Sequence, residues 1–437
     1  MPDDLLTRVL TEKIKNKKSR IGIVGLGYVG VPLALRFLEA GFEVIGYETD
    51  LDKVRALTSG KKCFTHIDPK PIKQFVAEGR FEIYSDPDTL SYCDAILLCV
   101  PTPLTSTRDP DMHFIEEASC HVASVLRRGQ LIILESTTYP GTTETVVVNI
   151  LNQNINGFKA GEEFFVAYSP EREDPGNKDF SLKNTPKVVG GLTAECTKLA
   201  VLLYEQIVDK VVPVSSCAAA EMTKILENTY RAVNIALVNE LKIVSHRLGI
   251  DIWEVINAAK TKPYGFQAFY PGVGCGGHCL PLDPHYLSWR ARQVKTPTRF
   301  IDFAGDINWE MPRYVARRIQ DALNAKSRPV KGAQILMLGV AYKKNIGDTR
   351  ESAAIKLINE LETLGAKIAY HDPFVAKIPD SDLLHVALIP RFIENMDCIV
   401  VAVAHDGVDY ALIHEHAPLI VDTCNVFPRG SNKVVQA

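Results

Sequence analysis

The sequence has no strong excess of either charge, no long apolar run and no internal repeat. Its 49 lysines and arginines nearly balance 52 aspartates and glutamates, and the net charge of -3 indicates no polyanionic partner. The longest apolar runs have the length of a strand and cannot span a bilayer. We identify no signal peptide, so we expect a cytoplasmic protein that binds neither nucleic acid nor a membrane.

The ten cysteines are too dispersed over 437 residues to form a disulfide scaffold, which favours a reducing compartment. Most are expected to be small buried apolar side chains. Apolar residues make up 46% and charged residues 23% of the chain, which is ordinary globular composition. At roughly 100–200 residues per domain, this length predicts two to four domains.

The segment from Tyr270 to Asp283 is the most unusual part of the chain. It has four glycines between Gly272 and Gly277, followed by Cys279. Such a loop offers bare N–H groups to a ligand, and a thiol beside it is a candidate nucleophile. The alternative is a metal site that includes Cys275, Cys279 and His278, but His285 is the only near candidate for a further ligand, so we expect no metal.

A strand, a glycine turn, a helix and a second strand open the chain, in residues 20–24, 25–30, 31–40 and 42–47. Glu48 ends the second strand. This order predicts a dinucleotide-binding unit, in which the first glycine makes the turn, the second admits the pyrophosphate and the third allows close packing. A carboxylate at Glu48 would take the ribose hydroxyls and repel a 2′-phosphate, which favours NAD over NADP.

Asp50 and Lys53 fit the cap and the edge of the next helix better than a ribose contact. Three more strand-like runs follow, in residues 93–100, 130–134 and 164–168. Because ligands of open parallel sheets bind at the carboxyl ends of strands, Thr102, Ser136 and Thr137 should lie near the nicotinamide. The alternative is that they cap helices.

Glu171 directly follows the third of these strands and could face the site. Residues 215–248 then read as one long helix, apolar nearly all round, which predicts burial between subunits or domains and at least a dimer. Lys224 and Asn228 share one face of it. Ion pairing of Lys224 with Glu221 or Glu227 is the alternative to a role in the site.

A second α/β unit begins after a linker at residues 326–330, with strands at 334–341 and 367–371. Its first turn lacks G-x-G-x-x-G, so no second dinucleotide is expected. The Lys343–Lys344 pair suits a nucleotide phosphate, unless both lysines are simply solvated. We predict an α/β chain with two Rossmann-like doubly wound domains joined by a long central helix. The predicted domains are residues 1–212, 213–328 and 329–437.

With these motifs assembled, the chain resembles the UDP-glucose/UDP-mannose dehydrogenase family over nearly its whole length, and most resembles its UDP-N-acetylglucosamine 6-dehydrogenase branch. The carrying motifs are residues 25–30, 99–103, 135–137, 169–177, 220–228, 262–271, 274–279 and 347–352. The resemblance implies a four-electron oxidation of the sugar C6 alcohol to a carboxylate, with two NAD⁺ used in turn. It also implies a surface-glycan pathway.

In the reaction that the resemblance implies, a water near Lys224 and Asp283 helps the first hydride to leave. Cys279 then captures the aldehyde, and a thioester forms. Glu171 activates the water that releases the acid, while Lys224 and Asn228 stabilise oxyanion charge. The implied catalytic residues are Cys279, Lys224, Asn228, Glu171, Asp283 and Thr137.

The expected binding residues fall into two sets. The set for NAD comprises Gly25, Gly27, Tyr28, Val29, Gly30, Glu48, Lys53, Pro101, Thr102, Ser136, Thr137 and Arg350, the last reaching across from another domain. The set for the UDP-sugar comprises Glu171, Arg172, Lys224, Asn228, Tyr270, Gly272, Gly274, Gly276, Tyr342 and Lys343.

Two positions depart from the family pattern. Cys424 stands where the family usually has an arginine that touches the nucleotide, and Glu48 stands where it usually has aspartate. Two alternatives stay open. The enzyme could act on UDP-N-acetylmannosamine or UDP-glucose, or the chain could be a nucleotide-sugar sensor without turnover.

Overall fold

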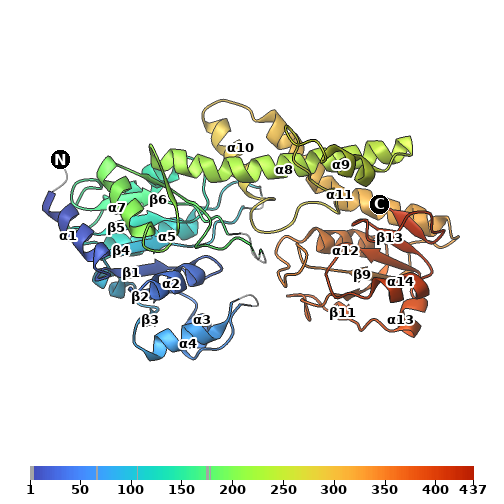
Figure 1. Ribbon diagram of the computed structural model, residues 1–437, viewed down its shortest axis with the longest axis horizontal. Coiled ribbons are helices and arrows are strands. Elements are labelled where there is room, and N and C mark those ends of the chain that lie inside the picture. Colours follow the sequence, from blue (N-terminus) through green and yellow to red (C-terminus); the bar gives the residue numbers. More distant parts are fainter. Residues whose placement is uncertain (1–3, 65–66, 106, 174–176, 178) are drawn as a thin grey trace. The chain divides into compact units, whose positions relative to one another are not determined.

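The computed structural model describes residues 4–64, 67–105, 107–173, 177 and 179–437, and it divides into two compact units (Figure 1). The first unit consists of residues 1–227 and 285–296. The second consists of residues 228–284 and 297–437. The helices α8 (Cys217–Leu248) and α10 (Asp283–Gln293) each contribute residues to both units.

An eight-stranded sheet forms the centre of the first unit, in the order β3-β2-β1-β4-β5-β6-β7-β8. Its strands are β1 Arg20–Val24, β2 Glu43–Tyr47, β3 Phe81–Tyr84, β4 Ala95–Leu98, β5 Leu131–Leu134, β6 Phe165–Tyr168, β7 Lys187–Gly191 and β8 Val211–Val214. All neighbours pair in parallel except β6 and β7, which are antiparallel. The strand order reverses at β1, where open α/β sheets bind their ligands at the carboxyl ends.

Helices cover both faces of this sheet (Figure 1). Those of the first unit are α1 Asp4–Lys15, α2 Gly30–Glu39, α3 Leu51–Thr58, α4 Pro69–Ala77, η1 Pro87–Tyr92, α5 His113–Ser124, η2 Thr143–Val147, α6 Val148–Leu151 and α7 Ala194–Tyr204. Ile14, Phe37 and Leu199 pack in the core on one face. Ile115 and Leu151 pack in the core on the other. These two cores of apolar side chains fix the helices to the sheet and so fix the positions of the strand ends.

A six-stranded, wholly parallel sheet lies in the second unit, in the order β11-β10-β9-β12-β13-β14. Its strands are β9 Gln334–Leu338, β10 Lys367–His371, β11 Leu384–His385, β12 Cys398–Val401, β13 Ile420–Asp422 and β14 Val434–Gln436. Helices α11 (Arg299–Asn324) and α12 (Ala353–Thr363) cover one face, and α13 (Pro390–Glu394) and α14 (Tyr410–His416) cover the other. The short helix α9 (Ile252–Ala259) packs beside α8.

The predicted fold class is confirmed, with a mainly parallel doubly wound sheet in the first unit and a wholly parallel one in the second. β1 and β10 have the predicted bounds, whereas other strands are shorter than the apolar runs that indicated them, as with β4, which spans Ala95–Leu98 rather than residues 93–100. The three-domain division remains a prediction. Within the described part of the chain, no helix is both long and apolar enough to cross a membrane.

Candidate active site

The glycine turn after β1 has the geometry that a dinucleotide diphosphate requires. Gly25 has a φ of 89°, and a Cβ placed on it would lie 2.7 Å from the carbonyl oxygen of Cys99. A Cβ on Gly30 would overlap the carbonyl oxygen of Gly25, whereas the space beside Gly27 is open. An anion can therefore approach the N-terminus of α2, where unpaired N–H groups and the helix dipole favour it.

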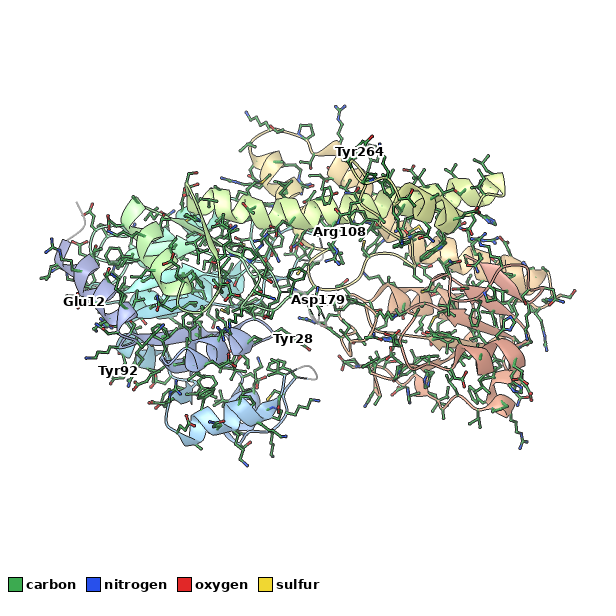
Figure 2. The ribbon with its side chains drawn as sticks, viewed as in Figure 1. Glu12, Tyr28, Tyr92, Arg108, Asp179 and Tyr264 are labelled. Carbon is green, nitrogen blue, oxygen red and sulfur yellow. The ribbon has the colours of Figure 1, made fainter. Side chains whose placement is uncertain are left out.

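The two residues between these glycines continue the turn. Val29 precedes the first residue of α2. Tyr28 is labelled in Figure 2. Its ring meets that of Phe64 edge-on, with 5.1 Å between the ring centroids. Phe64 therefore limits where the Tyr28 ring can lie beside the turn.

Glu48 is buried at the end of β2 and is held by three donors. These are the N–H of Leu26 at 3.0 Å, the N–H of Asp50 at 3.2 Å and the ammonium of Lys53 at 2.8 Å. A carboxylate has about four acceptor positions, so Glu48 can still accept from a ribose hydroxyl. The turn and this acid together fit NAD.

The structure separates the roles expected of Asp50 and Lys53. Asp50 caps α3 by accepting hydrogen bonds from the N–H groups of Asp52 and Lys53, as predicted. The Lys53 side chain does more than mark the helix edge, because its ammonium forms an ion pair with Glu48. The spacing of five residues between Glu48 and Lys53 was the signal that could have indicated this pair.

The ends of β4 and β5 carry the hydroxyl groups expected near the nicotinamide. Thr102 and Ser136 are buried, and Thr137 is half-buried. The Ser136 hydroxyl donates to the carbonyl oxygen of Val100 at 2.7 Å, which ties the two strand ends together. Ser136 therefore fixes the backbone here, while a role of Thr102 and Thr137 toward NAD remains a prediction.

Glu171 and Arg172 follow β6, and both are tied to the protein. One oxygen of Glu171 accepts hydrogen bonds from the N–H groups of Arg172 at 2.7 Å and Glu173 at 2.5 Å. The Arg172 guanidinium binds Glu227 at 2.6 Å and the carbonyl oxygen of Pro186 at 2.6 Å. Arg172 is thus a brace between the loop and α8 in this structure.

Lys224 lies buried on α8, and the structure removes the ion pairs that were its alternative role. Glu227 binds Arg172, and Glu221 accepts from the N–H groups of Gly141 and Thr143. Within the described residues, Lys224 has no carboxylate within ion-pair distance. A buried ammonium needs a polar partner, which supports its assignment to the substrate.

The cysteine loop leads directly into α10. The carbonyl oxygen of Cys279 accepts hydrogen bonds from the N–H groups of Leu282 at 3.0 Å and Asp283 at 2.8 Å. The Asp283 carboxylate is buried and accepts from the Asn228 side-chain amide at 2.5 Å. Cys279 is half-buried and forms no disulfide. These contacts bring the predicted nucleophile, acid and amide together in one unit.

Some of the loop glycines serve internal packing. A Cβ on Gly276 or on Gly277 would lie 2.9 Å from an atom of Tyr342. The N–H of Gly277 donates to the carbonyl oxygen of Arg350, whose guanidinium binds Asp348. These glycines therefore allow the loop to lie against the residues after β9, and not all of them leave space for a ligand.

The start of the loop is fixed by α8 and α9. The Tyr270 ring stacks on that of Trp253, with centroids 5.0 Å apart, and its hydroxyl donates to Asn257 at 3.0 Å. The N–H of Gly272 donates to the Asn239 side chain at 3.1 Å, and its carbonyl oxygen accepts from Lys242 at 3.2 Å. Neither Asn239 nor Lys242 was predicted, although both are polar residues of α8 that are buried.

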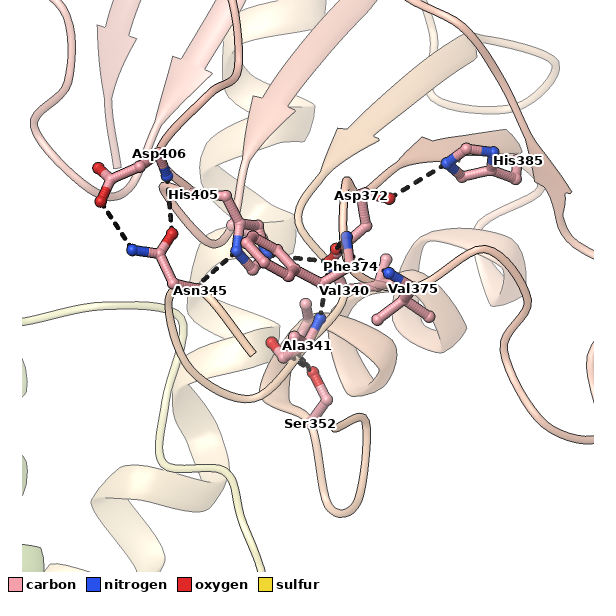
Figure 3. Close-up of polar contacts among 12 residues, drawn as sticks. Val340, Ala341, Asn345, Ser352, Asp372, Phe374, Val375, His385, His405 and Asp406 are labelled. Carbon is pink, nitrogen blue, oxygen red and sulfur yellow. Dashed lines mark hydrogen bonds and ion pairs between the residues drawn. The ribbon is translucent and has the colours of Figure 1, made fainter. Parts of the chain in front are cut away.

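Asp372 follows β10 at the position that Glu48 has after β2, but hydrogen bonds from the protein occupy all the acceptor positions of its carboxylate (Figure 3). It accepts from the N–H groups of Val340, Ala341, Phe374 and Val375, at 2.8–3.1 Å, and from His405 at 3.0 Å. With five donors bound, it has no acceptor position left for a ribose. The expected absence of a second dinucleotide therefore has a structural reason.

The loop after β9 carries the expected phosphate-binding residues. The N–H of Tyr342 donates to the carbonyl oxygen of Asp348 at 2.9 Å. Lys344 forms an ion pair with Asp406 at 2.6 Å, and Asn345 also binds Asp406 (Figure 3). Both side chains of this ion pair are exposed, so the alternative of a solvated Lys344 stays open, and Lys343 remains the predicted phosphate contact.

Cys424 lies half-buried after β13. Its N–H donates to Asp422, and its thiol contacts the carbonyl oxygen of Ala402 at 3.4 Å. Burial raises the pKa of Cys424 to about 11. The side chain is therefore a neutral thiol, and it cannot supply the positive charge of an arginine.

Three family models match the chain. They are described as the NAD-binding, central and UDP-binding domains of the UDP-glucose/GDP-mannose dehydrogenase family, and they cover residues 19–208, 218–310 and 336–429. The description names GDP-mannose where the sequence resemblance gave UDP-mannose.

Curated relatives cover most of the chain. A UDP-N-acetyl-D-mannosamine dehydrogenase of Pyrococcus horikoshii is 35% identical over 88% of this chain and 89% of its own length. A UDP-N-acetyl-D-glucosamine 6-dehydrogenase of Pseudomonas aeruginosa is 34% identical over 89% of this chain and 91% of its own. The solved structure of the UDP-D-ManNAc dehydrogenase from P. horikoshii matches with a TM-score of 0.85 and 33% identity, over 95% of this chain and 98% of that one.

Proposed function

Since the chain belongs to the UDP-glucose/GDP-mannose dehydrogenase family and is an NAD-dependent UDP-sugar dehydrogenase, we propose that its substrate is UDP-N-acetylglucosamine. The reaction oxidises C6 from the alcohol to the carboxylate, and bound NAD⁺ supplies the hydride acceptor twice. The observation that carries this proposal is the position of Cys279, whose carbonyl oxygen accepts from the N–H of Asp283 while the Asp283 carboxylate binds Asn228.

In the first oxidation, C6 loses a hydride and its hydroxyl loses a proton, giving an aldehyde. The proton passes to a water held by Lys224 and Asp283. The burial of both side chains supports these roles, because a charge excluded from bulk water interacts more strongly with a developing alkoxide. The Asn228 amide orients the Asp283 carboxylate through their hydrogen bond.

In the second oxidation, the Cys279 thiolate adds to the aldehyde carbon, and the aldehyde oxygen takes a proton, giving a thiohemiacetal. Loss of a second hydride and of that proton gives a thioester. Lys224 stabilises the oxygen as it gains negative charge. The covalent bond prevents release of the aldehyde between the two oxidations.

Hydrolysis completes the reaction. Glu171 accepts a proton from a water as the water attacks the thioester carbon, and the bond to Cys279 breaks as the sulfur leaves. The sugar is released as the acid, and the free thiol is restored. The support for Glu171 is its second carboxylate oxygen, which is buried and has no hydrogen-bond partner within the described residues.

The substrate is tested by measuring rates on UDP-N-acetylglucosamine, UDP-N-acetylmannosamine and UDP-glucose side by side. We expect the highest kcat/KM for UDP-N-acetylglucosamine and two NADH for each sugar acid. The two curated relatives above act on different N-acetylhexosamines at almost equal identity, so the rate comparison decides between them. A higher kcat/KM for another sugar would overturn the substrate, and one NADH per product would overturn the chemistry.

A further inference from the structure

Two buried charged residues, Lys187 and Glu135, lie next to Glu171 in the first unit and form a charged cluster with it. Neither Lys187 nor Glu135 has a role in the reaction scheme above. Lys187 is on β7, and its ammonium nitrogen lies 2.6 Å from Glu135 and 3.9 Å from Glu171. The side chains of Lys187 and Glu135 are 4% and 0% exposed, and that of Glu171 is 14% exposed. Charges so deeply buried require a partner or a function.

We propose that Lys187 and Glu135 are positioning residues that keep the Glu171 carboxylate ionised, and one of its oxygens free, for hydrolysis of the thioester. This inference rests on the proposed function, because it gives the residues that control the proposed base. It explains a feature of the chain that neither substrate nor cofactor binding requires.

The two oxygens of Glu171 have different surroundings, as a base requires. One oxygen is fixed by the N–H groups of Arg172 and Glu173. The other faces Lys187 at 3.9 Å, which is close enough for electrostatic attraction but too far for a hydrogen bond. The ammonium therefore favours the ionised form without occupying the lone pair that would accept the proton of water.

Glu135 holds Lys187 at this distance. One of its oxygens binds the ammonium, and the other accepts a hydrogen bond from the buried hydroxyl of Tyr204. The ammonium also donates to the carbonyl oxygen of Pro170 at 3.2 Å and lies 5.2 Å from the centre of the Tyr204 ring. With these partners, Lys187 cannot move to Glu171 without breaking a buried ion pair.

The cluster contains more carboxylates than ammonium groups. Burial raises the pKa of Glu135 to about 7 and that of Glu173 to about 7, and the charge of Glu171 adds to both shifts. Burial lowers the pKa of Lys187, but Glu135 and Glu171 outweigh it, so the pKa is raised overall. Lys187 thus stays charged beside these carboxylates.

Two further titratable groups face the cluster, and both are neutral. Burial raises the pKa of the Cys99 thiol and of the Tyr204 hydroxyl well above their usual values. The nearby Arg172 guanidinium is bound to Glu227 and Pro186. Among the described residues, Lys187 is therefore the one cation within ion-pair distance of the Glu171 carboxylate.

The proposal predicts pH shifts of opposite sign in two variants. Lys187→Met removes the positive charge beside the Glu171 carboxylate, so the acidic limb of the kcat profile, where activity falls as the pH is lowered, should move to higher pH. Glu135→Gln removes a negative charge, so the acidic limb moves to lower pH. A merely structural role would lower activity in both variants and move neither limb.

The experiment uses the full chain with UDP-N-acetylglucosamine and NAD⁺. Stopped-flow absorbance separates the fast formation of NADH from the later steady rate, which reports hydrolysis. Lys198→Met and Glu195→Gln, at an exposed ion pair on the neighbouring α7, are matched controls that should leave the profile unchanged. If Lys187→Met does not fold, Lys187→Arg keeps the positive charge and should leave the acidic limb of the kcat profile at the wild-type pH. Glu135→Gln then still tests the direction of the shift.

Shifts in the same direction for Lys187→Met and Glu135→Gln would overturn the proposal, as would an unchanged limb in Lys187→Met. The fast phase distinguishes this failure from failure of the proposed function. Wild-type protein that forms no NADH with any UDP-hexose overturns the dehydrogenase itself. If the wild-type protein shows a normal fast phase but the two variants do not shift the acidic limb in opposite directions, only the roles of Lys187 and Glu135 are overturned.

Discussion

Cys275 and Cys279 lie four residues apart in one loop, and both are half-buried. Burial raises the pKa of Cys275 to about 12. Since the thiolate is the nucleophile, a thiol with so high a pKa is inert at neutral pH. Cys279 is followed by α10, and its carbonyl oxygen is held by the first N–H groups of that turn. We therefore expect the Cys279 thiol, and not that of Cys275, to react as the nucleophile.

Cys279→Ala should lower formation of the sugar acid by more than about a thousandfold, because no thioester can form. Cys275→Ala is the matched control in the same loop and should retain most of the activity. Both variants are compared by chromatographic quantification of the acid. Normal acid production by Cys279→Ala would remove the thioester from the mechanism.

Lys242 illustrates a buried charge that costs stability. It is buried on α8, and burial lowers its pKa to about 8, from 10.5. Between these two pH values the unfolded chain binds more protons than the folded chain does. The lysine therefore destabilises the fold fully below pH 8, and this cost disappears as the pH rises toward 10.5.

Lys242→Met should raise the free energy of unfolding at neutral pH by about 2 kcal/mol, after allowing for the lost hydrogen bond to Gly272. The gain should shrink as the pH rises above 8. Thermal unfolding at several pH values measures it. A gain that does not depend on pH, or a loss of stability at neutral pH, would contradict this account.

At the scale of the elements, α8 carries an apolar stripe that the single chain leaves exposed. In the second unit the stripe consists of Tyr230, Leu237, Leu241, Val244 and Leu248, which are 42–67% exposed. Their spacing of three, four or seven residues places them on one face of the helix. A groove of about 520 Å³ lies beside Tyr230 and Leu237 and is lined further by Phe266 and Phe269. We propose that a second copy of the chain covers this stripe.

Leu241→Glu should convert the proposed dimer into monomers, because a charge would have to be buried at the interface. Leu364→Glu is the control, since Leu364 is also 42% exposed but lies at the end of α12. Sedimentation velocity at micromolar concentration measures both variants. A wild-type protein that is already monomeric would contradict the dimer.

The elements that the sequence predicts well are the buried ones. β1, β5 and β6 are fully or nearly fully buried, so each has a continuous apolar run. The strands β8 and β14 lie at the sheet edges, are only partly buried and span just four and three residues, and neither was predicted from the sequence. The long helix α8 was predicted because neither glycine nor proline interrupts it.

At the scale of the whole molecule, the two units repeat the same strand–helix–strand arrangement, but the acidic residue after the second strand has different partners in each. An acid follows the second strand of each main βαβ unit, as Glu48 in the first unit and Asp372 in the second. Glu48 has three donors and Asp372 has five. His405 accepts from the N–H of Asn345 through Nδ1, so its Nε2 carries the hydrogen that it donates to Asp372.

The chain should therefore bind one NADH, in the first unit. Glu48→Gln should weaken binding by about tenfold, or about 1.4 kcal/mol, through loss of a charge-assisted hydrogen bond. Asp372→Asn should lower the melting temperature and leave the number of sites unchanged. NADH fluorescence titration measures both quantities, and two equivalent sites per chain would contradict the assignment.

The sequence could indicate the residues of the site but not how they are paired. Local spacing revealed the glycine turn, the Asp50 cap and the shared face of Lys224 and Asn228. The contact between Lys187 and Glu135 joins residues 52 positions apart, on β7 and directly after β5, which are not neighbours in the sheet. No periodicity encodes such a contact, because it depends on the antiparallel pairing of β6 with β7.

The central claim is that Cys279 holds the sugar by a covalent bond between its two oxidations. Rapid quenching of Glu171→Gln with UDP-N-acetylglucosamine and NAD⁺, followed by intact-mass and peptide mass spectrometry, tests it most directly. We predict a mass increase equal to the acyl group of the UDP-sugar acid, located on the peptide that contains Cys279. Formation of NADH without any adduct, or an adduct on another residue, would contradict the account.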